Sequence, residues 1–149
     1  MKIGCIKSET TIGRSYYKVK KTVMNKDGKL LRFMLPLGCK LVHYKGIRRG
    51  AIIKIRNPLG MVYTYKVVTY STSKNKTTYH SIWKEGKMLS GIKFWSHRHF
   101  IEQMKGYTII KEELTFTTKN RLLDFFLHIF IKPYSWIRSL KYKIFFLFN

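Results

Sequence analysis

Acidic residues are scarce in this chain: 149 residues include seven Asp and Glu against thirty Lys and Arg, a formal net charge of +23. Such an excess suggests nucleic-acid binding, because contacts to phosphates require cations. However, the cations are spread along the whole chain, and Lys outnumbers Arg 22 to 8. A specific nucleic-acid footprint is clustered and favours Arg. We therefore interpret the charge as a general surface property and expect only nonspecific contact with nucleic acid.

Cysteine and long hydrophobic runs are also scarce. Cys5 and Cys39 lack a CxxC spacing, which predicts free thiols in a reducing, cytoplasmic setting. Residues 1–12 lack the apolar core of a secretory signal, and the most apolar run, residues 125–131, is far shorter than the roughly 20 residues of a membrane-spanning helix. With 45% hydrophobic and 15% aromatic residues, disorder is excluded. We expect one domain over residues 1–149 that acts as a monomer.

The pattern over the first two-thirds of the chain is mostly that of a sheet. Residues 1–12 read as an opening strand, and residues 15–35, interrupted at Asp27-Gly28, read as two short helices. Runs rich in β-branched and aromatic residues, separated by turn signals, then predict antiparallel strands at 39–45, 50–56, 61–70, 77–85, 92–102 and 107–116. With the opening strand, the sheet has about seven strands.

A long helix is expected after Thr117, with Asn120 as its N-cap. Pro133 should kink or restart this helix, because proline cannot donate a backbone hydrogen bond. Arg138 is expected to lie largely off the apolar stripe that packs on the sheet. The residues of that stripe are Leu122, Leu123, Phe126, Ile129, Phe130, Trp136, Ile137, Leu140, Ile144 and Leu147. The fold class is therefore α+β, with the helix laid against the sheet.

Three segments carry a resemblance to a known family. Residues 94–100 read Phe-Trp-Ser-His-Arg-His-Phe and contain a Trp-x-His-x-His pattern; in residues 106–116, Glu112 precedes Phe116 by four positions; and residues 122–142 run from an apolar segment to an aromatic and basic one. These features resemble the bacterial ligand-binding subgroup of the START-like (SRPBCC) superfamily. The resemblance covers residues 36–149 well and residues 1–35 more weakly.

The resemblance implies a helix-grip fold, in which a curved sheet wraps the C-terminal helix and leaves a cavity. It also implies non-catalytic binding of a hydrophobic small molecule or lipid. An enzymatic alternative is a polyketide cyclase or dehydratase, since the family includes such enzymes. A third alternative is a basic module that adheres to a membrane surface or to nucleic acid. The tail from Lys132 to Asn149 could touch anionic lipid, but we favour packing of this tail on the sheet.

Strand alternation places Trp95, His97 and His99 on one face of their strand. A His-x-His pair can ligate a metal, but a site needs a third ligand, which Glu112 or His80 would have to supply. No spacing requires either, so we predict no metal. Motifs for a catalytic nucleophile or a phosphate-binding loop are absent from the sequence, and we predict no cofactor and no catalytic residue. The expected cavity residues are Tyr63, Tyr65, Trp95, His97, His99, Glu112, Phe116, Phe126 and Phe130.

Glu112 shares a strand face with apolar residues, and burial there would raise its pKa unless a cation lies beside it. Buried charges are usually paired. We therefore favour a structural ion pair of Glu112 with Arg98 or a histidine over a role as polar anchor or general acid. Asp124 and His128, four residues apart on the predicted helix, are expected to form a helix-stabilising contact.

Overall fold

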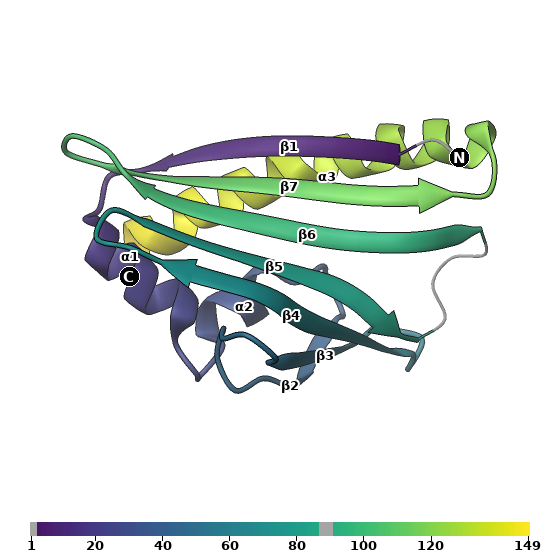
Figure 1. The fold of residues 1–149 in the computed structure, drawn as a ribbon, viewed down its shortest axis with the longest axis horizontal. Coiled ribbons are helices and arrows are strands. Elements are labelled where there is room, and N and C mark those ends of the chain that lie inside the picture. Colours follow the sequence, from purple (N-terminus) through teal and green to yellow (C-terminus); the bar gives the residue numbers. More distant parts are fainter. Residues whose placement is uncertain (1–2, 87–90) are drawn as a thin grey trace.

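The computed structural model describes residues 3–86 and 91–149, and within these ranges seven antiparallel strands form one sheet in the order β1-β7-β6-β5-β4-β3-β2. Figure 1 shows the sheet with the long helix behind it, one short helix at its left end and the other behind its lower strands. The strands are β1 (Ile3–Ile12), β2 (Lys40–His43), β3 (Ile52–Arg56), β4 (Val62–Thr72), β5 (Lys76–Glu85), β6 (Ile92–Gln103) and β7 (Thr108–Thr118).

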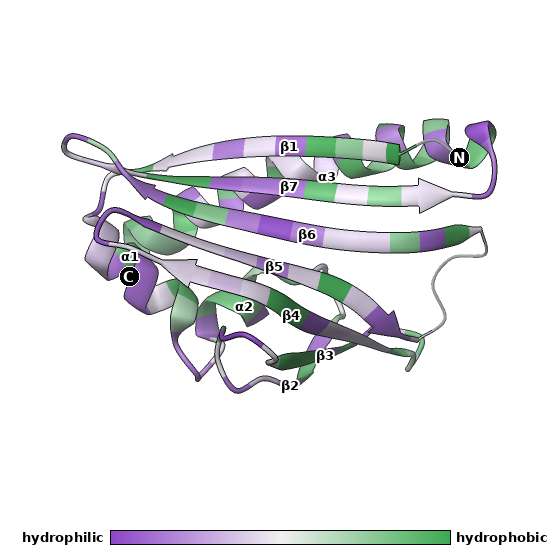
Figure 2. Cartoon of the chain, in the orientation of Figure 1, coloured by the Kyte–Doolittle hydropathy of each residue, from purple (hydrophilic) through white to green (hydrophobic). Residues whose placement is uncertain are grey.

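All seven predicted strands are present, close to their expected bounds, which confirms the α+β prediction. Residues 1–2 of the first predicted strand lie outside the described ranges. Buried and exposed side chains alternate along most of the strands, as in β1, and Figure 2 shows the resulting bands of hydrophilic and hydrophobic residues. One face of the sheet is therefore available to cover a cavity or core.

Two short helices follow β1: α1 (Tyr16–Met24) and α2 (Lys29–Met34). Ser15 caps α1 by accepting a hydrogen bond from the backbone N–H of Lys18. The predicted break lies between the helices, where Gly28 has a φ of 64°, a left-handed conformation that glycine adopts without steric cost. The prediction of two helices around Asp27-Gly28 is confirmed.

The closing helix, α3, spans Arg121–Phe148. Its N-cap is Asn120, as predicted, whose side chain accepts a hydrogen bond from the N–H of Leu123 at 2.8 Å. Pro133 lies inside the helix, which does not restart there. Buried residues anchor α3 both before Pro133, at Ile131, and further along the helix, at Tyr142, so the loss of one backbone hydrogen bond is tolerated.

The orientation of α3 differs from the prediction. Its buried residues are Asp124, Leu127, Ile131, Tyr142, Phe145 and Phe146, and α3 packs mainly against β1. Apart from the half-buried Leu123, the stripe expected to pack on the sheet is exposed. The physical reason is that α3 is apolar around most of its circumference, so that hydropathy alone does not select the inward face.

Phe116 is fully buried beside β1, next to the partly buried Trp95. Gly4 is the register partner of Phe116, and a Cβ atom at Gly4 would overlap the phenyl ring. This close approach requires glycine in β1.

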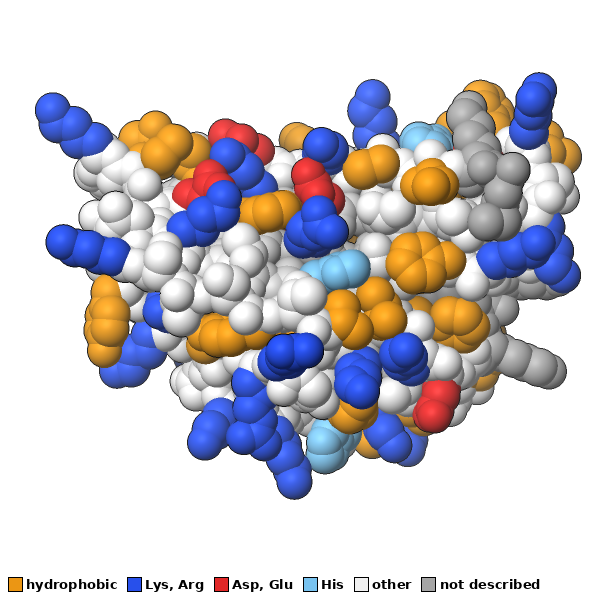
Figure 3. Space-filling view, viewed as in Figure 1, with side chains coloured by type: hydrophobic (Ala, Val, Ile, Leu, Met, Phe, Trp, Pro, Cys, Tyr) orange, Lys and Arg blue, Asp and Glu red, His pale blue; other side chains and the backbone are white. Residues whose placement is uncertain are grey.

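Lys and Arg side chains are scattered over the sheet face that Figure 3 shows, among few acidic ones. This distribution agrees with a diffuse charge rather than one basic patch on that face. In the described ranges, none of the helices combines the length and hydrophobicity needed to cross a membrane.

Candidate functional site

A cavity of about 320 Å³ lies between the sheet, α2 and α3. Its volume is at the lower end of the range for small-molecule sites. Apolar side chains form much of its wall, among them Ile6, Leu30, Met34, Ile53, Ile55, Leu114 and Ile131. Six tyrosines also line it: Tyr44, Tyr63, Tyr65, Tyr79, Tyr134 and Tyr142. The cavity is thus hydrophobic, with hydroxyl groups at several points.

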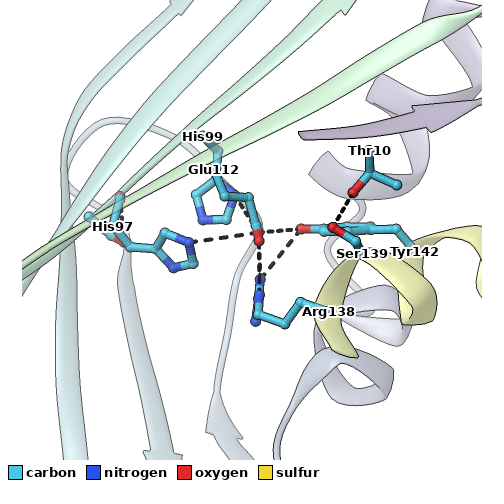
Figure 4. Close-up of polar contacts among 8 residues, drawn as sticks. Thr10, His97, His99, Glu112, Arg138, Ser139 and Tyr142 are labelled. Atoms are coloured by element: carbon cyan, nitrogen blue, oxygen red, sulfur yellow. Dashed lines mark hydrogen bonds and ion pairs between the residues drawn. The ribbon is translucent and has the colours of Figure 1, made fainter. Parts of the chain in front are cut away.

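One cluster of charged and polar groups, centred on the carboxylate of Glu112, interrupts this wall (Figure 4). Glu112 projects from β7 and is 5% exposed. Arg138 of α3 donates from Nε to Oε2 at 3.0 Å and from Nη2 to Oε1 at 2.6 Å. The hydroxyl of Tyr142, one turn further along α3, donates to Oε1 at 2.8 Å. The cluster therefore ties α3 to the sheet through bidentate and charge-assisted hydrogen bonds.

Two histidines of β6 lie beside the same carboxylate. Nδ1 of His99 is 3.2 Å from Oε1 of Glu112, and Nε2 of His97 is 3.7 Å from it. The ring of His99 stacks on Tyr79, with centroids 4.3 Å apart. His97 lies beyond hydrogen-bond distance of Glu112, and its side chain makes no hydrogen bond with the described residues. His97 therefore faces the cavity with an unused polar group.

The pKa shifts follow from burial and from Arg138. Burial lowers the pKa of His97 well below its ordinary value, and the neighbouring His99 lowers it further. Burial also lowers the pKa of His99, although the contact with Glu112 opposes this shift. Both imidazoles are therefore neutral at pH 7.

For Glu112, burial alone would raise the pKa, but the charge of Arg138 and the contacts with His99 and Arg138 outweigh burial and hold the pKa well below its ordinary value. Burial similarly disfavours the charged form of Arg138, yet Glu112 keeps the Arg138 pKa well above its ordinary value. Glu112 and Arg138 are consequently a carboxylate and a guanidinium across the physiological pH range.

The hydroxyl groups of two wall tyrosines, Tyr65 and Tyr44, remain protonated. Burial raises the pKa of Tyr65 to about 12, with a smaller contribution from Tyr63. Burial likewise raises the pKa of Tyr44 to about 12, with help from Asp27. Both tyrosines can donate hydrogen bonds at neutral pH.

The ion-pair partner of Glu112 is Arg138, not Arg98. Arg98 lies on the opposite face of β6 and pairs with Glu113, 3.7 Å away. This correction follows from strand alternation, since Arg98 and Glu113 both point away from the cavity. The predicted histidine contacts are present. His80 faces Arg98 in the register of β5 and β6, and therefore does not join His97 and His99.

His97, His99 and Glu112 each offer one possible metal-ligating atom, and these atoms lie within 4.8 Å of one another. Two imidazoles and a carboxylate are a donor set that suits several divalent metals. However, the guanidinium of Arg138 already binds both oxygens of Glu112 and supplies the positive charge. A cation here would have to displace Arg138 or share the carboxylate with it, so the geometry favours a structural cluster.

Six of the nine predicted cavity residues line the cavity: Tyr63, Tyr65, Trp95, His97, His99 and Glu112. Phe116 lies in the core, with its ring 5.9 Å from that of Trp95. Phe126 and Phe130 are 46% and 70% exposed and do not line the cavity. Their placement differs from the prediction because they belong to the outward face of α3.

Sequence reasoning missed Arg138 and Tyr142. Tyr134, Arg138 and Tyr142 follow at intervals of four residues, so they share one face of a helix, and all three line the cavity. This spacing could have indicated that Arg138 and Tyr142 lie on the cavity side of the helix. Arg138 was not distinguished from the many other basic residues of the chain. Asp124 and His128 do make a local contact, although the ring nitrogen of His128 meets the backbone carbonyl of Asp124 at 2.9 Å and not its carboxylate.

No protein-family model and no curated protein sequence matches the chain. Solved structures do match it in shape. Ara h 8.0201 superposes with a TM-score of 0.67 at 19% identity, covering 99% of this chain and 100% of that one. Norcoclaurine synthase from Thalictrum flavum, in complex with dopamine and hydroxybenzaldehyde, superposes with a TM-score of 0.66 at 14% identity. The match covers 94% of this chain and 85% of that one.

A START superfamily protein from Mycobacterium smegmatis has a TM-score of 0.59 at 9% identity and covers 92% of this chain and 94% of that one. At these identities the similarity establishes architecture and not activity. Together with the seven-stranded sheet and the closing helix, the comparisons show that the chain has a helix-grip fold similar to that of the START superfamily protein.

Proposed function

We propose that this protein binds a hydrophobic small molecule or lipid in the cavity between the sheet and α3, without converting it chemically. The observation that carries the proposal is the cavity of about 320 Å³, whose largely apolar wall is interrupted by one cluster of polar groups. Apolar burial supplies affinity in such a site, and a few polar groups fix the orientation of the ligand.

The polar end of the ligand would contact Arg138 and His97. Within the described residues, Nη1 of Arg138 has no hydrogen-bond partner, because Nε and Nη2 make the bonds of this side chain. His97 also keeps a free ring nitrogen at the cavity wall. Because Glu112 compensates the charge of Arg138, an uncharged acceptor such as a carbonyl or hydroxyl oxygen suits this position best.

Binding without catalysis is favoured by the state of Glu112. Its carboxylate accepts hydrogen bonds from Arg138 and Tyr142 and has a lowered pKa, so it is a weak base. His97 is the residue of this cluster that could exchange a proton with a ligand. A cyclase-like or dehydratase-like enzyme remains the second candidate, since norcoclaurine synthase has a similar fold. Loss of turnover in a His97→Gln variant would favour that alternative.

We further propose a cytoplasmic monomer. Cys5 is exposed and Cys39 partly exposed, and both are free thiols, which persist in a reducing compartment.

Native mass spectrometry of the protein purified from a cell extract tests the proposal. We expect a bound molecule that is retained under gentle ionisation and released on denaturation, and whose occupancy falls in a His97→Leu variant. A spectrum of unliganded protein alone, together with failure to take up any hydrophobic compound in solution, would contradict the proposed function.

A further inference from the structure

The outward face of α3 is an exposed hydrophobic surface. Eleven large apolar side chains of this helix are between 39% and 77% exposed, although α3 is the longest helix of the described chain. Leu122, Phe126, Ile129, Trp136, Leu140 and Leu147 belong to this set and follow at helical spacing. They form one stripe along α3, which at 28 residues is about 42 Å long. Exposed apolar surface of this extent marks an interaction site.

Basic side chains border the stripe on one side. Arg121, Lys132 and Lys143 follow at intervals of eleven residues, which is close to three helical turns, so they line up along the helix. All three are exposed, and none lies within ion-pair distance of a carboxylate in the described residues. The single acidic residue of α3, Asp124, is buried on the inward face. The outward face is thus hydrophobic and cationic, with no acidic side chain.

We infer that the outward face of α3 docks on an anionic lipid surface, with the helix lying in the plane of the membrane. An apolar stripe flanked by cations is the pattern of interfacial helices, in which apolar side chains enter the acyl region and cations meet lipid headgroups. Trp136, which is 70% exposed near the middle of the stripe, is an aromatic anchor of the kind found at that boundary. The cytoplasmic leaflet carries the complementary negative charge.

The positive charge of the chain favours an anionic lipid surface over a second copy of this chain as the partner of the outward face of α3. A symmetric dimer through α3 would bring two chains of net charge +23 together and place the same cations on both sides of the interface. An anionic membrane instead neutralises these cations. The docking face is separate from the cavity, since none of its stripe residues or flanking cations lines the cavity.

The test is flotation of the full chain with vesicles of phosphatidylcholine, with and without phosphatidylserine. We compare the wild type with an apolar pair, Trp136→Ser/Leu140→Ser, and a charge pair, Lys132→Glu/Lys143→Glu. The matched control, Lys54→Glu/Lys66→Glu, makes the same change in net charge at two exposed lysines of β3 and β4. The altered side chains of all three variants are exposed, and circular dichroism confirms their folding.

We expect the wild type to bind only vesicles that contain phosphatidylserine. Both α3 variants should bind about tenfold more weakly or worse, while the control keeps its affinity within about twofold. Equal loss in the control and the Lys132/Lys143 variant would mean diffuse charge adhesion and would overturn the inference. Undiminished vesicle binding by the Trp136→Ser/Leu140→Ser variant, or no vesicle binding by the wild type, would also overturn the inference. So would a wild-type dimer in solution that becomes monomeric in the Trp136→Ser/Leu140→Ser variant.

Discussion

The guanidinium of Arg138 on α3 binds both carboxylate oxygens of Glu112 on β7, at 3.0 and 2.6 Å. This pair joins two residues that are 26 positions apart in the chain, and it lies at the wall of the cavity. Both side chains are at most 12% exposed, so each charge depends on the other for compensation. The pair therefore connects the stability of the fold with the polarity of the proposed ligand site.

Replacing Glu112 with Gln should destabilise the protein by about 3 to 5 kcal/mol, because the substitution leaves the guanidinium of Arg138 buried without a counter-charge. Urea unfolding followed by circular dichroism measures this loss. The double variant Glu112→Gln/Arg138→Met removes both charges and should lose less stability than Glu112→Gln alone. If the urea concentration at the midpoint of unfolding is the same for Glu112→Gln and for the wild type, the ion pair does not stabilise the fold.

Stability should fall as the pH drops below about 6.5. His97 and His99 have pKa values lowered by burial, so the unfolded chain takes up protons near the ordinary histidine pKa of 6.5 while the folded chain does not. The stability that these neutral rings contribute is present above pH 6.5 and is lost on acidification. The free energy of unfolding then falls with a slope that approaches about 1.4 kcal/mol per pH unit for each ring.

Urea unfolding at a series of pH values between about 7 and 5 measures this slope. The variant His97→Gln should show a shallower slope, because one of the two protonation sites is gone. The lowered pKa of Glu112 adds a similar loss at lower pH, below the ordinary glutamate value of 4.5. An identical slope in the wild type and in His97→Gln would show that His97 is not buried as a neutral ring.

Gly4→Ala should cost about 1 to 3 kcal/mol of stability, since the new methyl group would overlap the fully buried ring of Phe116. Gly13→Ala is the matched control, because no atom lies within 4 Å of a Cβ at that position. Thermal unfolding of the two variants checks the prediction. Equal melting temperatures for both would mean that β1 does not approach Phe116 as closely as described.

Much of the fold followed from local signals in the sequence. Alternating β-branched and aromatic residues located the strands, Asp27-Gly28 separated α1 from α2, and Asn120 marked the start of α3. These signals are local, since they depend on backbone conformation and on the spacing of neighbouring side chains. The Trp-x-His-x-His pattern on β6 also located the site histidines.

The inward face of α3 could not be predicted in this way, because the helix carries apolar side chains on both faces. Which face packs on the sheet depends on a distant partner: Arg138 turns inward because Glu112 accepts its hydrogen bonds. For the same reason Phe126 and Phe130 lie outside. Such choices depend on contacts between residues far apart in the chain, which periodicity does not record.

The central claim is that the cavity takes up a hydrophobic ligand, and titration with the neutral fluorescent probe 1-N-phenylnaphthylamine tests it most directly. Ile55→Trp places a larger side chain in the cavity wall, whereas Lys54→Trp places the same side chain at an exposed neighbouring position of β3. Trp136→Ser/Leu140→Ser controls for probe bound to the outward face of α3. Circular dichroism of each variant verifies the fold.

We predict saturable binding by the wild type, by Lys54→Trp and by the α3 variant, and an affinity about tenfold lower or worse for Ile55→Trp. Wild-type affinity in a folded Ile55→Trp variant, or no saturable binding by the wild type, would contradict the account.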